Sequence, residues 1–497
     1  MKLDELLSFA RRKGFVWQSA ELYGGTAGFY DYGHNGAALK RKWEDAWLQF
    51  VFGLSDNNHL IDSAHIMPAS ALKASGHVAH FSDIVVECFN CKASHRADTL
   101  IEDKTGTSAE DLSCGEINSR IAESGIKCPK CGGTLSGAAP FNLMYPVSVG
   151  AKQNELAYLR PETAQGVYLN FSKEYELLRR KLPLGLAIIG RAYRNEIAPR
   201  QVLYRLRELI QAELQIFFDP EKFNSQVDFA SVSGMPLNVS LVSERDACSF
   251  RQITAGDLVK IGVCPVFFAF HMAAVQQFYV NKMGIPQEKF RFREKSEKER
   301  AFYNRLHFDV EVNLSSLGGF REVAGIHYRG DYDLTCHQNG SGKSQEINVD
   351  GRKFIPHVLE LSFGVDRNLW TLLDIHYTKE GDRSILKLPT SLASLDVGVF
   401  PLMARDGLDE KAREVSGHLK IHGLRVFYDE SGSIGRRYAR MDEIGTPFCI
   451  TVDYDTLKNN DVTIRERNSA KQFRVPVAEL PSKISELLGR SVCGRLA

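Results

Sequence analysis

Two apolar runs separated by a charged loop are the clearest pattern in the chain, and they predict a hairpin of two long strands. The runs cover residues 187–193 and 209–218, and Pro199 disfavours regular pairing between them. The loop carries five charged side chains: Arg194, Glu196, Arg200, Arg205 and Arg207. Because the guanidinium fork suits phosphates and carboxylates, one interpretation is a nucleotide site. The pattern alone is equally compatible with a solvated hairpin that carries surface salt bridges.

Helical periodicity is strongest near the N-terminus, where residues 35–52 place apolar side chains at three- and four-residue spacing. Trp43 and Trp47 lie on the apolar face of this helix, so they either pack in the core or form a subunit interface. Residues 59–66 predict a strand that stops before Pro68. A further helix is expected after Thr163, whose hydroxyl is suited to cap it.

Further strands are expected at residues 307–312, 318–331 and 358–363. The last of these meets Gly364, after which Asp366 and Arg367 open an apolar helix. The helix dipole disfavours a cation at that end, and such a local conflict is typical of a functional site. The charge-dense run at residues 289–300 indicates either a solvated helix surface or a patch that faces phosphate or tRNA.

Beyond residue 388, strands alternate with helices, which predicts a mixed, largely parallel α/β sheet. Three arginines on one expected helix form a candidate basic patch, namely Arg436, Arg437 and Arg440.

Length and charge limit the class of protein. A chain of 497 residues predicts roughly two to four domains, and a net charge of +1 means that any nucleic-acid contact uses local patches. No apolar run approaches the ~20 residues of a membrane span, and the first residues lack a signal-like apolar core. The expectation is a cytoplasmic protein without a membrane segment.

Four of the ten cysteines form two Cys-x-x-Cys pairs, Cys88/Cys91 and Cys128/Cys131. This spacing lets four thiolates share one tetrahedral ion, which predicts a ribbon-like insertion with structural Zn²⁺. The alternative is four unliganded thiols. A catalytic zinc is disfavoured because four cysteines leave no open coordination position.

Four segments together resemble class II glycyl-tRNA synthetases of the homodimeric, single-polypeptide type. RNEIAPR with RLREL is similar to motif 2, ELSFGVDR to motif 3, and residues 31–68 with LKASGH to motif 1, the dimer-interface element. RPETAQG at residues 160–166 is the most glycyl-specific segment.

The resemblance implies an α+β fold with a class II antiparallel catalytic sheet, flanking helices, a Cys-rich insertion and a C-terminal mixed α/β anticodon-binding domain. The boundaries that we expect are 1–83 for the N-terminal part with the dimer motif, 84–140 for the zinc-ribbon-like insertion, 141–388 for the catalytic domain with an insertion at 219–305, and 389–497 for the anticodon-binding domain.

The implied activity joins glycine and ATP into glycyl-adenylate and then transfers glycine to tRNA(Gly), with AMP and pyrophosphate released. The resemblance assigns catalysis to Arg194, Glu196 and Arg367. It assigns ATP binding to these three and to Asn195, Arg205, Arg207, Glu322, Val323, Gly364 and Asp366, with Mg²⁺ on Glu322. The residues implied for glycine are Arg96, Glu162, Leu209, Gln211, Glu213, Arg329, Glu360 and Ser362.

Glycine has no side chain that the enzyme could contact, so selection requires a pocket already filled by protein side chains, with anions around the ammonium. Because larger amino acids would clash with the pocket walls, no editing site is expected. The chain departs from the family pattern at His34, Phe320, Arg321 and Leu361, none of which removes a charge that the chemistry needs. Two rival hypotheses are a class II synthetase for another amino acid and a non-catalytic nucleic-acid-binding relative.

Overall fold

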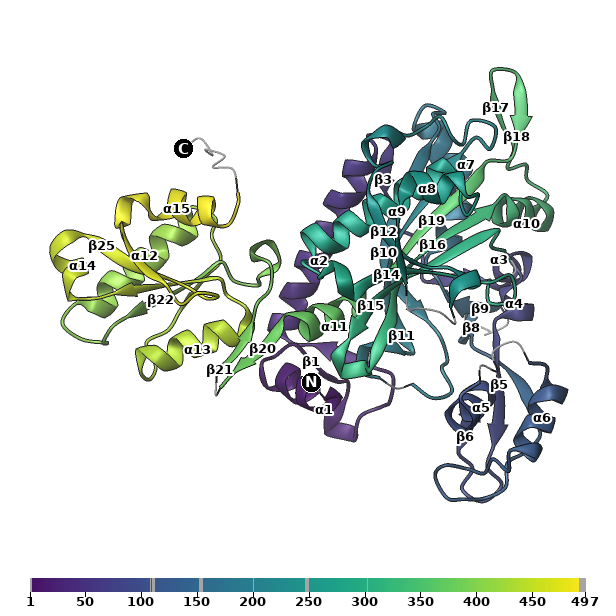
Figure 1. The fold of residues 1–497 in the computed structure, drawn as a ribbon, viewed down its shortest axis with the longest axis horizontal. Helices are drawn as coiled ribbons and strands as arrows, with labels where there is room; N and C mark the ends of the chain where they lie inside the picture. Colours follow the sequence, from purple (N-terminus) through teal and green to yellow (C-terminus); the bar gives the residue numbers. More distant parts are fainter. Residues whose placement is uncertain are drawn as a thin grey trace.

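The computed structural model describes residues 2–107, 109, 112–151, 155–199, 201–245, 250–301, 303–381 and 383–490. Arg200, one of the loop arginines expected from the sequence, lies outside these ranges. Figure 1 shows three regions: a large sheet with its helices, a small Cys-rich region beside it, and a C-terminal region on the opposite side.

A nine-stranded sheet forms the centre of the molecule, with the order β13-β12-β14-β15-β16-β19-β11-β10-β3. All neighbours are antiparallel except β10 with β3 and β12 with β14. The strands are β3 (Asn58–Leu60), β10 (Leu184–Tyr193), β11 (Glu208–Phe218), β12 (Pro236–Ser240), β13 (Arg251–Thr254), β14 (Phe290–Glu294), β15 (Leu306–Leu314), β16 (Gly319–Gly330) and β19 (His357–Gly364). The predicted hairpin is therefore present as β10 and β11, paired from Leu184 with Phe217 to Tyr193 with Glu208.

Helices cover both faces of this sheet. The largest apolar core joins the sheet to α1 (Leu3–Arg12), α2 (His34–Leu54), α8 (Ala255–Lys260), α9 (Val266–Gln277) and α11 (Val365–His376). A second core forms where α7 (Ala164–Leu177) and α10 (Tyr332–Ser341) pack on β10, β11 and β19. Trp43 and Trp47 are fully buried in the first core, so of the two explanations for these tryptophans core packing is right.

Two expectations about local structure are wrong. Residues 59–66 do not form one strand, because Asn58–Leu60 pairs with β10 whereas β4 (Ile66–Pro68) pairs with β9 (Glu155–Leu159) in another sheet. The charged run at 289–300 is not a helix. Its first part is β14, in which Phe290 and Phe292 are buried while the arginines pair with acids on β15 and in the segment that follows β14.

The Cys-rich region has its own small sheet and core. The sheet has the order β6-β5-β7, from β5 (Ser82–Glu87), β6 (Ser94–Arg96) and β7 (Ala139–Asn142). The helices α5 (Ala97–Thr105) and α6 (Cys114–Glu123) pack on it around Val86 and Ile101. Short elements that join this region to the main sheet are α3 (Ala69–Ala74), α4 (His77–His80) and β8 (Pro146–Val149).

The C-terminal region is a five-stranded sheet of order β23-β22-β24-β25-β26, formed by β22 (Val397–Pro401), β23 (Val426–Tyr428), β24 (Phe448–Val452), β25 (Asp461–Glu466) and β26 (Gln472–Pro476). Two of its four pairings are parallel and two are antiparallel, so the sheet is mixed but not largely parallel. Its helices are α12 (Leu408–Ile421), α13 (Ile434–Ile444), α14 (Tyr454–Asn459) and α15 (Leu480–Leu487).

The expected basic patch on α13 is only partly exposed. Arg437 is buried and donates to the backbone carbonyls of Pro401 and Leu402, and Arg440 pairs with Asp429. The C-terminal region meets the N-terminal part through the ion pair of Lys13 with Glu443, at 2.5 Å. Within the described ranges, no helix is both long enough and apolar enough to cross a membrane.

Remaining short elements are the hairpins β1 (Val16–Gln18) with β2 (Tyr30–Tyr32), β17 (Ile347–Val349) with β18 (Arg352–Phe354), and β20 (Tyr377–Glu380) with β21 (Arg383–Leu386).

Candidate active site

Three buried glutamates and one buried arginine lie on the α7 face of the main sheet, and two of the glutamates contact the arginine. Glu213 comes from β11, Glu360 from β19, and Glu162 from the segment just before α7. Arg329 on β16 lies 3.1 Å from Glu360 and 3.5 Å from Glu162. Because strand side chains alternate between faces, the register of β11, β16 and β19 brings these residues together.

Arg329 is itself held by a residue that we did not assign to the site from the sequence. Asp333 in α10 accepts from its Nε at 2.8 Å and from its Nη2 at 2.9 Å. The Arg329 guanidinium also lies 4.0 Å from the centre of the Tyr303 ring. Arg329 lies at the end of β16 and Asp333 in the first turn of α10, so helical i, i+4 pairing does not apply and no sequence pattern indicated this pair.

The three glutamates differ in their protonation. Burial alone would raise the pKa of Glu162, but His77 and Arg329 outweigh it and hold the pKa well below its usual range. Burial likewise opposes ionisation of Glu360, yet the charge of Arg329 and the hydrogen bond from His327 hold its pKa below the usual range. Burial, together with the charges of Glu360 and Glu162, raises the pKa of Glu213 to about 7. At neutral pH the site therefore holds two ionised carboxylates, Glu162 and Glu360, and one carboxyl group, Glu213, that titrates near neutrality.

Glu213 is fixed by two hydroxyls, because Thr163 donates to it at 2.6 Å and Ser362 at 2.8 Å. The Thr163 hydroxyl is therefore not the expected helix cap: Thr163 precedes α7, but its side chain accepts no capping hydrogen bond. Gln211 accepts from the Thr163 amide at 3.1 Å, so it supports the start of α7.

Side chains beyond those expected also contact the glutamates. Gln165 donates to Glu162 at 2.9 Å, and Gln215 donates to Glu360 at 2.7 Å. His77 lies 3.4 Å from Glu162, and His327 hydrogen-bonds Glu360. Gln165 lies within RPETAQG, and Gln215 continues the period-two row of Gln211 and Glu213, so both had a sequence signal. Neither histidine stood out in the sequence.

A cavity of about 260 Å³ is lined by several arginines at the loop end of the β10–β11 hairpin. Its lining includes eight of the residues expected to contact ATP or glycine, namely Arg96, Arg194, Glu196, Arg205, Leu209, Gly364, Asp366 and Arg367. Arg194 donates through Nε to the Pro161 carbonyl at 3.0 Å and lies over the Phe81 ring. The Pro161 contact ties the cavity to the segment that carries Glu162.

The motif 3 arginine, Arg367, lines this cavity and pairs with an acid on β16. Nη1 of Arg367 lies 2.9 Å from Oε1 of Glu322, whose side chain is 49% exposed. Asn368 donates to the carbonyls of Val323 and Gly364 at 3.0 and 2.9 Å, which holds β16, β19 and α11 together. An exposed carboxylate beside a cationic cavity fits a Mg²⁺ that arrives with ATP.

Two of the residues expected to contact ATP, Asp366 and Arg207, already use their side chains in hydrogen bonds within the protein. Asp366 accepts from the Ile210 amide at 2.6 Å and from the Tyr32 hydroxyl. Arg207 donates to the Glu196 carbonyl at 3.0 Å and to the Ala27 carbonyl at 3.1 Å. Burial raises the pKa of Asp366 to about 6. Of the paired motif 2 arginines, it is Arg205 that lines the cavity.

Arg96 and Asn195 complete the set expected from the sequence. Arg96 comes from the Cys-rich region, where it pairs with Asp83 at 2.9 Å and with Asp98. It lines the arginine cavity, and no described contact joins it to Glu162, Glu213 or Glu360. The Asn195 amide donates to the Leu143 carbonyl at 2.6 Å, which anchors the loop that follows β10.

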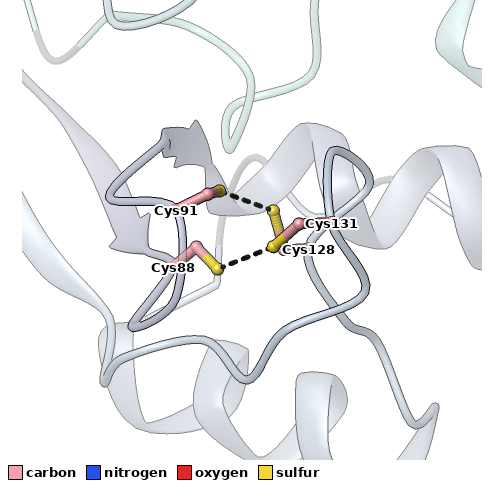
Figure 2. Close-up of side chains that lie close together, drawn as sticks. All are labelled: Cys88, Cys91, Cys128 and Cys131. Atoms are coloured by element: carbon pink, nitrogen blue, oxygen red, sulfur yellow. Dashed lines mark hydrogen bonds between the residues drawn. The ribbon is translucent and has the colours of Figure 1, made fainter.

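The four cysteines converge as their spacing predicts (Figure 2), and their sulfur atoms all lie within 4.8 Å of one another. Sγ of Cys88 is 3.5 Å from Sγ of Cys131, and Sγ of Cys91 is 3.7 Å from Sγ of Cys128. Ligands at Zn–S distances of 2.3 Å in a tetrahedron are about 3.8 Å apart, so the donor set fits Zn²⁺. His95 Nε2 lies 3.3 Å from Sγ of Cys128.

The two larger regions of the chain match known protein domains. Residues 145–376 match the tRNA synthetase class II core domain (G, H, P, S and T), and residues 396–487 match the anticodon binding domain. A prolyl-tRNA synthetase from Cryptosporidium parvum, solved with L-proline and AMP, has a similar fold at 13% identity and a TM-score of 0.58. That match covers 97% of this chain and 74% of the other.

The curated relatives are closer. The glycine–tRNA ligase of Thermococcus gammatolerans is 38% identical over 98% of both chains, and that of Methanococcus vannielii is 36% identical over 98% of this chain and all of its own. Identity at this level over nearly the whole length, with both domains matched in order, shows that the chain belongs to the glycine–tRNA ligase family of class II synthetases.

Proposed function

We propose that this protein attaches glycine to tRNA(Gly) in two steps, through a glycyl-adenylate formed from ATP. The observation that carries the proposal is the buried cluster of Glu162, Glu213 and Glu360 with Arg329, which the contact of Arg194 with Pro161 ties to the arginine-lined cavity. The first feature suits a small ammonium compound, and the second suits a polyphosphate. Membership of the glycine–tRNA ligase family supports the same reaction.

In the first step the glycine carboxylate attacks the α-phosphate of ATP and pyrophosphate leaves. Catalysis of such a step depends on positioning and on neutralising charge. Arg194 contacts the α-phosphate and the carboxylate, and Glu196 binds the adenine amino group. Arg205 and Arg367 hold the other phosphates, and Glu322 would hold the Mg²⁺ that accompanies ATP, which would neutralise phosphate charge.

Selection of glycine follows from the same pocket. The carboxylates of Glu162 and Glu360 accept hydrogen bonds from the ammonium, with Ser362 beside them and Arg329 as their support. Glu213, Thr163 and Gln211 fill the floor, so a methyl group on Cα has no space. Exclusion by overlap discriminates strongly against larger amino acids, and no separate editing site is part of the proposal.

The proposal extends to tRNA(Gly) binding by the C-terminal region and to a homodimer that uses the motif 1 segment, residues 31–68. The domains would be 1–83, 84–140, 141–388 with its 219–305 insertion, and 389–497. The Cys₄ cluster would hold a structural Zn²⁺, which requires reduced thiolates and is consistent with a cytoplasmic location.

The test is ATP–pyrophosphate exchange by the purified protein with a panel of amino acids. Glycine alone should support exchange, whereas threonine, proline, histidine and alanine should not. Glu162→Ala and Glu360→Ala should each nearly abolish the exchange. Exchange with another amino acid, or exchange at wild-type rates in both variants, would refute the assignment of the pocket.

A further inference from the structure

A row of polar side chains crosses four strands beneath the glycine pocket. The register places His307 of β15 opposite His327 of β16, His327 opposite Glu360 of β19, and Glu360 opposite Gln215 of β11. Directly opposed side chains on one face of a sheet lie within contact distance of one another. The row therefore runs from the carboxylate expected to bind the ammonium toward the edge strands.

The contacts along this row are continuous. Nδ1 of His327 hydrogen-bonds Oε1 of Glu360, and its Nε2 lies 3.0 Å from Nε2 of His307. Nε2 of His307 also lies 2.9 Å from Oδ1 of Asp309, which in turn lies 3.5 Å from Lys295. The His327 side chain is only 15% exposed, so the chain of contacts is largely shielded from water.

A glycine makes room for the two imidazoles. Gly325 precedes His327 by two residues on the same face of β16, and a Cβ atom there would lie 2.6 Å from Nε2 of His327. Such a distance is well inside van der Waals contact, so any larger residue at 325 would displace the ring. The edge-to-face arrangement of His307 and His327, with ring centres 4.2 Å apart, thus depends on this glycine.

The geometry selects one proton arrangement. Asp309 pairs with Lys295 and Arg293, so it is an anion and accepts the hydrogen on Nε2 of His307. The same N–H also points to Nε2 of His327, so that nitrogen is the unprotonated acceptor. The hydrogen of His327 is therefore on Nδ1, which donates it to Glu360. Nδ1 of His307 is buried with no hydrogen-bond partner among the described residues, which suits an unprotonated nitrogen there.

We infer that His327 is a positioning residue for glycine: neutral and oriented by His307 and Asp309, it holds one oxygen of Glu360 in place to meet the substrate ammonium. The other oxygen already accepts from Gln215 at 2.7 Å and from Arg329 at 3.1 Å, so both ends of the carboxylate are fixed. Because a neutral imidazole adds no positive charge, the pocket keeps its attraction for a cation. This inference rests on the proposed role of Glu360.

The experiment measures KM for glycine and for ATP separately, by pyrophosphate exchange. The variants at position 327 differ in whether a hydrogen-bond donor remains at the position of Nδ1. In His327→Asn the side-chain amide takes the position of Nδ1, whereas in His327→Gln it takes that of Nε2. We expect His327→Ala and His327→Gln to raise KM for glycine by about 10- to 100-fold, because a hydrogen bond to a charged group is lost. His327→Asn should stay within about threefold of the wild type, and KM for ATP should change less than about twofold in all three.

The matched control is His357→Asn, since His357 lies on β19 with a similarly shielded side chain and contacts Tyr328 instead of a pocket residue. It should leave both KM values unchanged. Unchanged KM for glycine in His327→Ala, equal losses in the Asn and Gln variants, or a rise of KM for glycine in His357→Asn would each overturn the inference. Glu360→Gln distinguishes failure of the proposed glycine site from failure of the role of His327. If Glu360→Gln binds glycine as the wild type does, the proposed site is wrong. If Glu360→Gln is impaired and His327→Ala is not, only the role of His327 is wrong.

Discussion

Arg367, which lines the arginine-lined cavity, forms an ion pair with Glu322, with Nη1 of the arginine 2.9 Å from Oε1 of the glutamate. Arg367 lies in the first turn of α11, where the helix dipole disfavours a cation, and Glu322 lies on β16. Glu322 offsets this unfavourable position by pairing with the guanidinium. A charged side chain held against the local preference of its element is typical of a functional site.

We therefore expect Arg367→Ala to lower the rate of pyrophosphate exchange by roughly 100-fold or more, the usual effect of removing one preorganised charged donor. Arg474→Ala is the control, because Arg474 pairs with Asp453 and Asp461 in the C-terminal region. It should leave exchange unaffected. A near wild-type rate in Arg367→Ala would remove this residue from the chemistry.

The two motif 2 arginines should behave differently. Arg205 lines the cavity, whereas the guanidinium of Arg207 donates to the backbone carbonyls of Glu196 and Ala27. Arg205→Ala should raise KM for ATP about tenfold or more, because a charge-assisted contact is worth about 1.5–3 kcal/mol. Arg207→Ala should mainly reduce the free energy of unfolding, by about 1–2 kcal/mol. The opposite result, with Arg207 controlling KM for ATP, would reverse the assignment.

Zinc content gives a direct test of the cysteine cluster. The purified protein should contain one zinc per chain by elemental analysis, and Cys88→Ser or Cys128→Ser should lose it because the tetrahedral set is broken. Cys114→Ser is the matched control, since Cys114 lies in the same region at the start of α6 and outside the cluster. Wild-type protein free of zinc, or a Cys114→Ser variant that loses it, would contradict the site.

The raised pKa of Glu213 predicts a pH-dependent effect on stability. Its ordinary pKa is 4.5 and its folded pKa is about 7, so between these values the folded state binds more protons than the unfolded state. Stability from this group is complete below pH 4.5 and declines as pH rises through 7. Glu213→Gln should therefore gain about 1–3 kcal/mol in free energy of unfolding, relative to wild type, on going from pH 5 to pH 8.

Urea unfolding of both proteins at the two pH values measures this difference. Glu221→Gln is the control, because Glu221 is exposed on the segment after β11 and pairs only at the surface with Arg352. The Glu221→Gln variant should follow the wild type at both pH values. A difference between Glu213→Gln and wild type that stays constant with pH would mean that Glu213 ionises normally.

Local pattern was sufficient for much of the fold. The alternation on either side of the charged loop predicted β10 and β11, and the cysteine spacing predicted a cluster that the fold does assemble. The helix over residues 35–52 was predicted within two residues at each end. These features depend on neighbours a few positions apart, so periodicity and spacing encode them directly.

Local pattern misled where a segment had two possible partners. Residues 59–66 have strand character throughout, but their two ends pair with strands of different sheets. Thr163 has the residue type of a helix cap, yet its hydroxyl reaches Glu213, a side chain fifty positions away in sequence. In both cases a long-range contact replaced the local one, because the tertiary neighbour offered a buried partner that the local backbone did not.

The sequence by itself determined the residue types of the site: the loop arginines, the acids before α7 and on three strands, and the cysteine pairs. Only the tertiary structure decided which of them meet. Arg205 rather than Arg207 lines the cavity, Asp366 accepts a hydrogen bond from the Ile210 amide, and His327 lies beside Glu360. The physical reason is that elements far apart in sequence become neighbours only through packing of the whole core. On the strands this depends on register, because a shift of one residue would turn His327 to the opposite face.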